Sequence, residues 1–323
     1  MTLSATQAVE VLRAAGEPTR LRILALLAHE ELAVLELCRV LGQSQPRVSR
    51  HLKLLAEAGL VERFPDGAWV FYRLQSAGEA GRLASEILSH IDSADAVLAA
   101  DAQRLSAVWS ERASEAGEYF ARNAARWDEI RSLYVSEASV EQAILEAAGP
   151  GSFDRLVDLG SGTGRMLTLL APRARQALGL DLSQQMLNIA RNQVAEAGLA
   201  GCELRHGDIF STRLPDACAD LVVVHQVLHY LADPAAATKE AARLVAPGGK
   251  LLIVDFAPHR LEFLREQHQH RRLGFSESEM NRWLSSAGLS QVRVTALPPS
   301  REDGLTVLIW TARRATQRQR SAA

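Results

Sequence analysis

The stretch LVDLGSGTG, residues 156–164, predicts a buried strand that runs directly into a glycine turn. A short apolar run bounded by glycines is typical of a parallel-sheet strand, because helices cover both faces of such a strand. Gly160, Gly162 and Gly164 would let the backbone approach a ligand closely. Their G-x-G-x-G spacing differs from the G-x-G-x-x-G spacing of the dinucleotide fingerprint, so the loop alone identifies no ligand.

Acidic residues accompany the first three predicted strands of this half of the chain. Asp158 lies in the first strand, and Asp181 and Asp208 follow the second and the third. The Asp181 carboxylate could accept hydrogen bonds from both hydroxyls of a ribose. Asp208 could accept one from an adenine amino group while Leu182 and Ile209 cover the two faces of the ring. The set predicts an adenosine ligand with a polar, cationic appendage rather than a phosphate that needs a lysine.

Four motifs occur in a fixed order, namely DLGSGTG at 158–164, Asp181, GDI at 207–209 and VAPGG at 245–249. Together they resemble the motif series of class I S-adenosylmethionine-dependent methyltransferases, over roughly the second half of the chain. The resemblance implies an α/β fold with a Rossmann-like seven-stranded sheet that binds S-adenosylmethionine or S-adenosylhomocysteine. It also implies that the first motif holds the methionine end, Asp181 the ribose and the GDI motif the adenine. Any one motif alone is equally typical of a strand-end cap or a turn.

The composition limits the classes of protein that this chain can belong to. Its 323 residues, 47% of them apolar, allow about two or three domains with hydrophobic cores, and its net charge is -2. A uniformly basic nucleic-acid coat is excluded, so any DNA contact must come from a local patch. Cys38, Cys202 and Cys218 are too widely spaced for a disulfide framework or a C-x-x-C zinc site. The N-terminus does not resemble a signal peptide and no apolar run is long enough to span a membrane, so we expect a cytoplasmic protein.

The first 80 residues predict a winged helix-turn-helix domain. Ser44 is a suitable N-cap for a helix that has Val48, Leu52 and Leu55 on one face. Two strands after this helix, separated by the turn sequence PDGA, predict the hairpin of a wing. The predicted elements are helices at 9–28 with a break at 16–19, at 31–41 and from residue 45 onward, then strands at 59–64 and 69–74.

The opposite face of the helix that follows Ser44 is polar and cationic. Guanidinium and amide groups there could reach base edges in the major groove, and Arg63 and Arg73 could contact phosphates from the wing. A charged arc is also typical of a solvated helix face, but the adjacent wing favours DNA binding. The predicted DNA-binding residues are Gln45, Arg47, Ser49, Arg50, His51, Lys53, Arg63 and Arg73.

Three segments of this region, EPTRLRIL at 17–24, SQPRVSRHL at 44–52 and GAWVFYRL at 67–74, resemble the ArsR/SmtB family of bacterial repressors. The resemblance covers about the first quarter of the chain. The metal-binding box of the family corresponds to ELAVLEL at 31–37, in which apolar side chains occupy both thiolate positions. Cys38 alone cannot chelate a soft metal, and His90 has no partner at ligand spacing. We therefore predict no metal site, so the signal must enter elsewhere.

A long helix or a pair of helices is predicted from residue 82 to about residue 127, because glycine and proline are scarce and apolar residues alternate in steps of three and four. ArsR-type proteins dimerise through terminal helices, so the resemblance implies a homodimer that binds a palindromic operator in double-stranded DNA. The alternative is that this seam packs within the chain on the methyltransferase domain. Asp101 interrupts the seam, whose apolar residues are Ile87, Ile91, Ala94, Leu98, Leu105 and Val108.

The aromatic-rich segment at 119–128 resembles the segment that precedes the first strand in small-molecule methyltransferases, where it often covers the cofactor. Its aromatic side chains could close over a substrate or could simply belong to the core.

Two histidines follow the fourth predicted strand, at 220–224, whose carboxyl end should face the ligand. His225 or His229 could be a general base for a hydroxyl or thiol group of a small-molecule methyl acceptor. Alternatively, either histidine could pack under the adenine or cap a helix. The sequence lacks the Asp/Asn-Pro-Pro-Tyr and Pro-Cys motifs of DNA base methyltransferases near this position, so we do not expect methylation of DNA.

A segment rich in histidine and arginine lies further along the chain and contains His268, His270, Arg271 and Arg272. These side chains could bind an anionic acceptor or the carboxylate of an effector. A solvated connector is the commoner explanation of such a segment. The elements predicted around it are a strand at 250–254, a helix at 277–287 and two edge strands at 291–295 and 305–311.

The predicted domains are an ArsR-type winged helix at 1–80, a helical linker, dimerisation and lid segment at 81–145, a class I methyltransferase domain at 146–312 and a disordered tail at 313–323. This combination admits two functions of different kinds. The chain could be a transcriptional repressor whose second domain binds the adenosyl ligand as an effector. It could instead be an active small-molecule methyltransferase with a fused autoregulatory DNA-binding domain. The cofactor motifs serve both functions equally.

Overall fold

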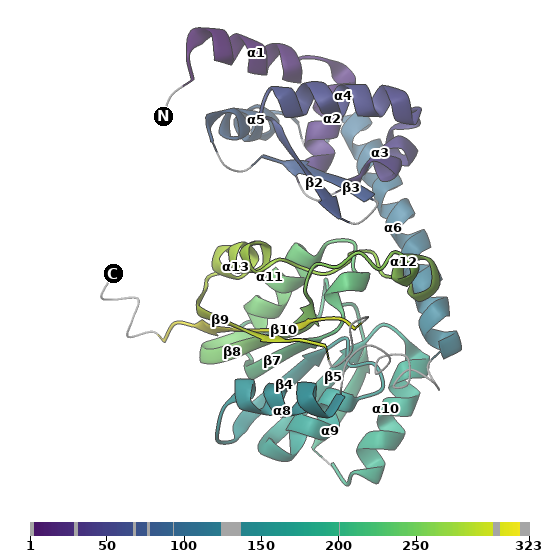
Figure 1. Ribbon diagram of the computed structural model, residues 1–323, viewed down its shortest axis with the longest axis vertical. Coiled ribbons are helices and arrows are strands. Elements are labelled where there is room, and N and C mark those ends of the chain that lie inside the picture. The colour runs from purple at the N-terminus through teal and green to yellow at the C-terminus, as the bar shows by residue number, and fades with distance from the viewer. Residues whose placement is uncertain are drawn as a thin grey trace. The chain divides into compact units, whose positions relative to one another are not determined.

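The predicted strand at 156–159 lies inside β4, the third strand in a seven-stranded sheet with the order β6-β5-β4-β7-β8-β10-β9. In this computed structural model (Figure 1), β4 pairs in parallel with β5 and β7, and β10 is antiparallel to β8 and β9. The predicted α/β fold and the antiparallel final pair are confirmed. The strands are β4 (Phe153–Leu159), β5 (Ala174–Asp181), β6 (Cys202–His206), β7 (Ala219–His225), β8 (Val245–Phe256), β9 (Leu289–Leu297) and β10 (Val307–Arg314).

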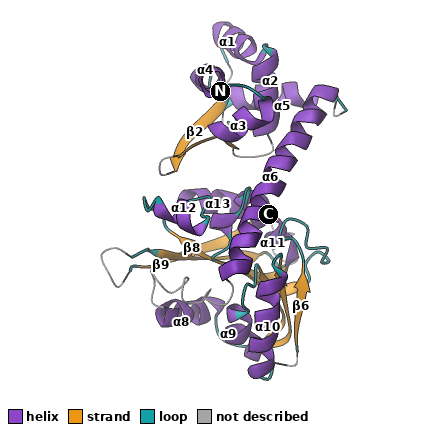
Figure 2. Ribbon diagram, turned by 90° about the vertical axis from the view of Figure 1, so that its right-hand side faces the viewer, coloured by secondary structure: helices purple, strands orange, loops and turns teal. Residues whose placement is uncertain are grey.

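Alternating residues of β4 enter two different hydrophobic cores. Val157 and Leu159 pack on the face covered by α11 and α13, and Leu156 packs on the face covered by α8, α9 and α10. Figure 2 shows these two helical layers on opposite sides of the sheet. Because both faces are buried, the strand reads as a continuous apolar run. The helices are α8 (Glu137–Ala148), α9 (Arg165–Leu170), α10 (Gln184–Glu196), α11 (Pro234–Leu244), α12 (Phe263–His268) and α13 (Glu277–Ser286), with short 3-10 turns η2 (Ala171–Arg173) and η3 (Leu228–Tyr230).

The chain divides into two compact units, Met1–Ser114 and Glu115–Ala323. The division falls inside helix α6 (Ala96–Asn123), whereas the sequence predicted boundaries at 80 and 145. β10 continues to Arg314, so the first two residues of the predicted tail belong to a strand. The structure describes residues 3–28, 32–66, 69–75, 78–92, 94–123, 137–199, 201–299 and 304–316.

The first unit contains a winged helix, as predicted. Its three strands have the order β1-β3-β2, and the hairpin pairs Val61 with Leu74 through to Asp66 with Trp69. The predicted helix at 31–41 begins later, because Leu32 and Ala33 form β1 against Tyr72 and Phe71. The elements are α1 (Ala5–Ala15), α2 (Pro18–Leu27), β1 (Leu32–Ala33), α3 (Val34–Leu41), α4 (Gln45–Glu57), β2 (Val61–Asp66), β3 (Trp69–Leu74) and α5 (Glu79–Ser89).

The predicted helix or helix pair after the wing is a pair, α5 and α6. Leu105 and Val108 of α6 are buried in the core of the first unit. This part of the seam therefore packs within the first unit. Most of the segment at 119–128 lies outside the residues whose side chains are described, although Phe120 is described.

Asp101, which interrupts the apolar seam of α6, is a buried anchor. Its carboxylate is 1% exposed and accepts hydrogen bonds from Arg22 Nε at 2.6 Å and Arg22 NH2 at 2.7 Å. Arg104 also donates to it, and Arg104 Nε donates to the Val40 carbonyl. Because the buried charge has two guanidinium partners, its desolvation is offset and it links α6 to α2 and α3.

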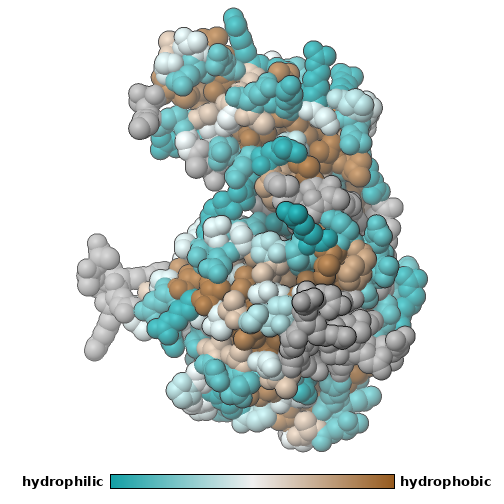
Figure 3. Space-filling view, in the orientation of Figure 1, coloured by the Kyte–Doolittle hydropathy of each residue, from teal (hydrophilic) through white to brown (hydrophobic). Residues whose placement is uncertain are grey.

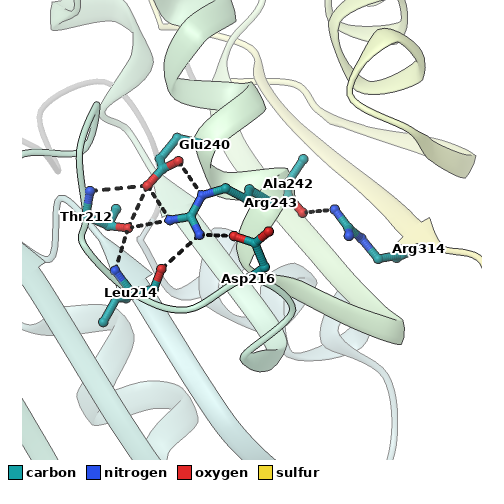
Figure 4. A network of polar contacts seen from close by, with 7 residues as sticks. All are labelled: Thr212, Leu214, Asp216, Glu240, Ala242, Arg243 and Arg314. Atoms are coloured by element: carbon teal, nitrogen blue, oxygen red, sulfur yellow. Dashed lines mark hydrogen bonds and ion pairs between the residues drawn. The ribbon is translucent and has the colours of Figure 1, made fainter.

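A network around Arg243 of α11 holds the segment between β6 and β7 (Figure 4). Its Nε donates to Glu240, and NH1 donates to the Leu214 carbonyl and to Asp216. NH2 donates to Glu240 and Thr212, so every N–H of the guanidinium has a partner. The Thr212 amide and hydroxyl also donate to Glu240, the hydroxyl at 2.6 Å. The network therefore fixes the chain that leaves the GDI motif.

The described surface is largely hydrophilic on the face drawn in Figure 3, with apolar side chains in smaller areas between polar ones. Val9 and Leu12 of α1 are 45% and 50% exposed. Among the described residues, we find no helix whose length and hydropathy would suffice to cross a membrane.

Glu240→Gln should destabilise the second unit in a pH-dependent way. The Arg243 guanidinium lowers the pKa of Glu240 from 4.5 to about 2. The ionised carboxylate therefore contributes its full stability above pH 4.5, and loses it as the pH falls from 4.5 through about 2. We expect urea unfolding to give a free energy about 2 kcal/mol lower for the variant at pH 7, because Arg243 loses a charged partner.

The difference between variant and wild type should shrink as the pH is lowered below 4.5. Glu196→Gln, at the exposed end of α10, is the matched control and should change the free energy by less than about 0.5 kcal/mol. Equal effects of the two substitutions at pH 7 would contradict the role assigned to the Arg243 network.

Candidate functional site

The glycine loop after β4 adopts backbone conformations that favour glycine. Gly160, Gly162 and Gly164 have φ angles of 72°, 52° and 88°. The Gly160 and Ser161 amides donate to the Leu180 carbonyl at 2.7 and 3.0 Å, which ties the loop to the end of β5. A Cβ at Gly160 would lie 2.5 Å from Val227 Cγ2, so the segment after β7 packs directly against the loop.

Asp181 binds the same loop through its side chain. One carboxylate oxygen accepts from the Gly162 amide at 2.8 Å, and the other accepts from the Ser183 amide at 2.8 Å, at the start of α10. Burial raises the pKa of Asp181, and the two amides oppose that shift. Because each oxygen can accept a second hydrogen bond, the carboxylate can hold the loop and still bind hydroxyl groups.

Asp208 and its neighbours are placed at the end of β6, next to the end of β5. Asp208 is exposed, and its carboxylate accepts from the Phe210 amide at 2.9 Å. Leu182 is 52% exposed, whereas Ile209 is 7% exposed and packs in the core. Of the two residues predicted to cover an adenine ring, Leu182 therefore has its side chain on the surface, and Ile209 is mostly enclosed.

The first motif also contributes buried polar groups. Asp158 is 1% exposed and Ser161 is 7% exposed. The Ser161 hydroxyl has no hydrogen-bond partner among the described residues. These groups fit an adenosyl ligand. The acidic residue at the end of β5 and the exposed leucine beside it would contact the adenosine. The amides of the glycine loop and the buried polar groups would contact the amino-acid end of the ligand. This ligand supplies an electrophilic methyl group when it is S-adenosylmethionine.

His229, in η3, is buried and paired. Its Nδ1 lies 2.7 Å from Asp255 Oδ1, and the two side chains are 1% and 0% exposed. His225, at the end of β7, is half-buried. A packed histidine was one of the two predicted alternatives, but its pairing with Asp255 was not predicted, although an acidic residue in the apolar run of β8 was the available signal.

The histidine- and arginine-rich segment is not a solvated connector, because His270 and Arg272 are 7% and 4% exposed. The Arg271 and Arg272 amides donate to the His229 carbonyl at 2.8 and 3.0 Å. Arg272 also pairs with Glu279 at 2.8 Å. Burial lowers the pKa of His270, and the nearby His229 lowers it further. The segment at 257–276 therefore forms a cap over the end of β8.

The polar face of α4 keeps most of its predicted DNA-binding residues on the surface. Val48, Leu52 and Leu55 are buried on the opposite face, as predicted. Ser44 occupies the N-cap position, but its side chain accepts no capping hydrogen bond. His51 is turned toward α2, where its Nδ1 lies 3.5 Å from Glu17 Oε2, and Ser49 is half-buried. The exposed residues of the face are Gln45, Arg47, Arg50 and Lys53.

The two arginines of the wing differ in their surroundings. Arg63 is exposed. Arg73 donates to Glu62 Oε2 from Nε at 2.9 Å and from NH2 at 2.8 Å, and its guanidinium lies 5.1 Å from the centre of the Phe64 ring. Arg73 therefore holds the wing together, whereas Arg63 is available to a phosphate.

The segment that corresponds to the metal box has a structural role here. Glu36 is buried and accepts a hydrogen bond from the Ala33 amide at 2.7 Å, which caps α3. Burial raises the pKa of the Cys38 thiol, which disfavours the thiolate. No group of three or more His, Cys, Asp or Glu side chains suited to a metal ion occurs in the described part of the chain.

Comparison with known families agrees with both resemblances. Residues 17–63 match the family described as "Bacterial regulatory protein, arsR family", and residues 157–253 match the family described as "Methyltransferase domain". The chain therefore combines an ArsR-type helix-turn-helix with a methyltransferase domain, as the motifs predicted.

Several of the similar proteins are described as methyltransferases. The uncharacterized methyltransferase YcgJ of Bacillus subtilis is 25% identical over 148 residues, which cover 43% of this chain and 56% of that protein. The uncharacterized methyltransferase Rv3342 of Mycobacterium tuberculosis is 35% identical over 118 residues, covering 36% of this chain and 46% of that protein. The chain thus spans about half the length of these curated relatives. The fold is also found in a chain from a Haloferax volcanii complex between a methyltransferase and its activator. The two structures superpose with a TM-score of 0.51 at 21% identity, and the match covers 61% of this chain and 97% of that chain.

Gly160→Ala should destabilise the fold more than Gly198→Ala. Both glycines have positive φ angles, 72° and 67°, so both substitutions strain the backbone. A Cβ at Gly160 also collides with Val227, whereas no described atom outside the local chain lies within 4 Å of a Cβ at Gly198. We expect Gly198→Ala to cost about 1 kcal/mol and Gly160→Ala at least about 1 kcal/mol more, measured by urea unfolding. Equal losses of unfolding free energy in the two variants would show that the contact between the glycine loop and Val227 does not contribute to stability.

Proposed function

We propose that this chain is a DNA-binding transcriptional repressor whose methyltransferase domain binds S-adenosylmethionine or S-adenosylhomocysteine as an effector. The proposal rests on one observation: helix α6 has residues in both units, because the division at Ser114 falls within this helix. A ligand that changes the environment of one end of α6 therefore acts on an element of the DNA-binding unit.

The amino-terminal part of α6 is held firmly in the first unit. Leu105 and Val108 lie in its core, and Asp101 binds Arg22 with both carboxylate oxygens. A displacement of α6 would therefore act on α2 through a buried ion pair, which is costly to break.

The carboxyl-terminal part of α6 contacts the chain beside the candidate ligand site. The rings of Phe120 and Tyr230 are 4.9 Å apart in an edge-to-face arrangement. Tyr230 follows Val227, which packs against Gly160 in the glycine loop. Ligand binding at the glycine loop can thus act on α6 through two packed contacts. A difference in ligand affinity between two positions of α6 would make DNA binding depend on the ligand.

The DNA-binding side of the proposal rests on α4 and the wing. Gln45, Arg47 and Arg50 are exposed on α4, where they can reach base edges, and Arg63 is exposed on the wing. A homodimer on a palindromic operator in double-stranded DNA follows from the ArsR resemblance, and the exposed Val9 and Leu12 of α1 are consistent with a protein contact.

A second candidate function is an active methyltransferase with a small-molecule acceptor and a fused autoregulatory DNA-binding domain. The buried His229–Asp255 pair favours it, because this pair lies at the strand ends where an acceptor would bind. The two functions are compatible in one chain.

Arg47→Ala should weaken binding to the operator without changing affinity for the adenosyl ligand. Removal of an exposed guanidinium from α4 should cost about 1–3 kcal/mol in DNA binding if it contacts a base. The measurement is a DNA titration on the protein's own promoter at one fixed salt concentration, with ligand affinity followed by calorimetry. Arg191→Ala, an exposed arginine of α10, is the matched control and should leave DNA binding unchanged.

The effector role is tested by the same promoter titration with and without each adenosyl ligand. Ligand should shift DNA affinity by about 5- to 150-fold, the range typical of coupled sites. Asp181→Ala should bind DNA normally in the absence of ligand and lose the response, because it removes the carboxylate that holds the loop and the ribose. Asp154→Ala, on an exposed carboxylate at the start of β4, should respond as wild type does. Ligand binding by calorimetry with no shift in DNA affinity would refute the effector and favour the enzyme.

A further inference from the structure

The His229–Asp255 pair is chemically unusual for a purely structural contact. The Asp255 carboxylate accepts from His229 and from the Phe256 amide at 2.8 Å, both at the same oxygen. His229 Nε2 and Asp255 Oδ2 are buried, and neither has a hydrogen-bond partner among the described residues. Burying polar atoms without hydrogen-bond partners costs free energy. Such an arrangement is expected where a further group binds.

The geometry selects the state in which His229 can accept a proton. Asp255 Oδ1 lies at hydrogen-bond distance from Nδ1, so the carboxylate favours the tautomer with a proton on Nδ1. Nε2 then carries a lone pair. The same carboxylate holds the ring in this orientation while Nε2 accepts a proton.

The pair lies at the edge of the sheet where a methyl acceptor would bind. His229 follows β7, and Asp255 lies near the end of the neighbouring strand β8. Open parallel sheets bind ligands outside the carboxyl ends of their strands. Val227, two residues before His229, contacts Gly160 in the glycine loop. The pair is therefore adjacent in the chain to the segment that packs on the candidate adenosyl site.

Aromatic rings surround His229. The ring centres of Tyr230 and His270 lie 4.1 Å from it, and that of Phe256 lies 5.1 Å from it. Phe120 packs edge-on against Tyr230. Rings in these positions favour a planar aromatic group over a flexible polar one. His229 is 1% exposed, and the Arg271 and Arg272 amides of the cap at 257–276 bind its carbonyl.

We propose that His229 is the general base for methyl transfer to an aromatic hydroxyl or thiol, and that Asp255 is its positioning residue. The O–H or S–H bond of the acceptor breaks and its proton moves to Nε2. The freed electron pair forms the new bond to the methyl carbon, while the bond from that carbon to the sulfur of S-adenosylmethionine breaks and leaves its electrons on sulfur. The inference rests on the adenosyl binding proposed above and adds a catalytic activity to it.

The other titratable and charged groups near His229 come from the cap and from η3. His270 and Tyr230 contact its ring. Burial lowers the pKa of His270, and the charges of His229, His259, His268 and Arg265 lower it further.

The test uses the full-length chain with radiolabelled S-adenosylmethionine and three acceptors whose O–H or S–H group stays protonated near neutral pH, namely phenol, catechol and phenylmethanethiol. Wild type should methylate at least one of them. His229→Gln should lower kcat by about 100-fold or more, because general base catalysis typically contributes that much. Calorimetry should show S-adenosylmethionine affinity within about twofold of wild type, since no proposed ligand contact is removed.

Asp255→Asn is the second variant and keeps the proposal testable if His229→Gln does not fold. Its amide can donate to Nδ1 and so favour the wrong tautomer, which should lower kcat without changing KM. His90→Gln, on an exposed histidine of α5, is the matched control and should leave all values unchanged.

A readout that does not depend on turnover completes the test. Nitrogen-15 NMR of the histidine side chains, with S-adenosylhomocysteine added, should show a proton on Nδ1 and none on Nε2 of His229.

Three results would overturn the proposal. They are bound S-adenosylmethionine without transfer to any of the three acceptors, wild-type kcat in His229→Gln, and a proton on Nε2 in the resting protein. Failure to bind S-adenosylmethionine at all would instead refute the adenosyl site, and with it both proposals. Calorimetry therefore separates the two kinds of failure.

Discussion

A side chain does not fit at position 160, because a Cβ there would lie 2.5 Å from Val227 Cγ2. The loop after β4 consequently lies directly against the segment after β7, and its amides bind the Leu180 carbonyl at the end of β5. This contact brings the ends of three strands together. Asp181 strengthens it by accepting a hydrogen bond from Gly162. The positions of the candidate ligand-binding groups all depend on this one close approach, which is why it requires glycine.

Two buried carboxylates are used in different ways. Asp101 has partners at both oxygens, from Arg22 and Arg104, and its role is to fix α6 in the first unit. Asp255 has one oxygen that accepts from two groups and one with no partner among the described atoms. A buried carboxylate with partners at both oxygens has its desolvation offset. A buried oxygen without a partner is costly and needs a further explanation, such as a catalytic role. Burial alone would not distinguish them, because both are about equally inaccessible to water.

The regulatory and catalytic proposals meet at Tyr230. Its ring contacts Phe120 of α6 on one side and His229 on another. An acceptor that reached His229 would disturb the same aromatic contacts that connect the ligand site to α6. A chain that methylates an aromatic compound could in this way report the presence of that compound, together with its methyl donor, to the DNA-binding unit.

The sequence was sufficient for the features that depend on local pattern. The buried parallel strand, the glycine loop, the winged helix and the apolar face of α4 were predicted because their spacing is dictated by backbone geometry. Periodicity also showed that Asp101 interrupts a seam, but not that Arg22 would neutralise it, since the two residues are far apart in the chain.

Only the tertiary structure decided which polar side chains are available to a ligand. Arg73 and His51 resembled other DNA-contacting residues in sequence, but Glu62 and Glu17 turn them toward the protein. His270 and Arg272 were expected in a solvated connector, yet they are buried in a cap over β8. The pairing of His229 with Asp255 arises because β7 and β8 are neighbours in the sheet. Strand order and side-chain burial are set by contacts between distant segments, so the pattern of a single segment cannot contain them.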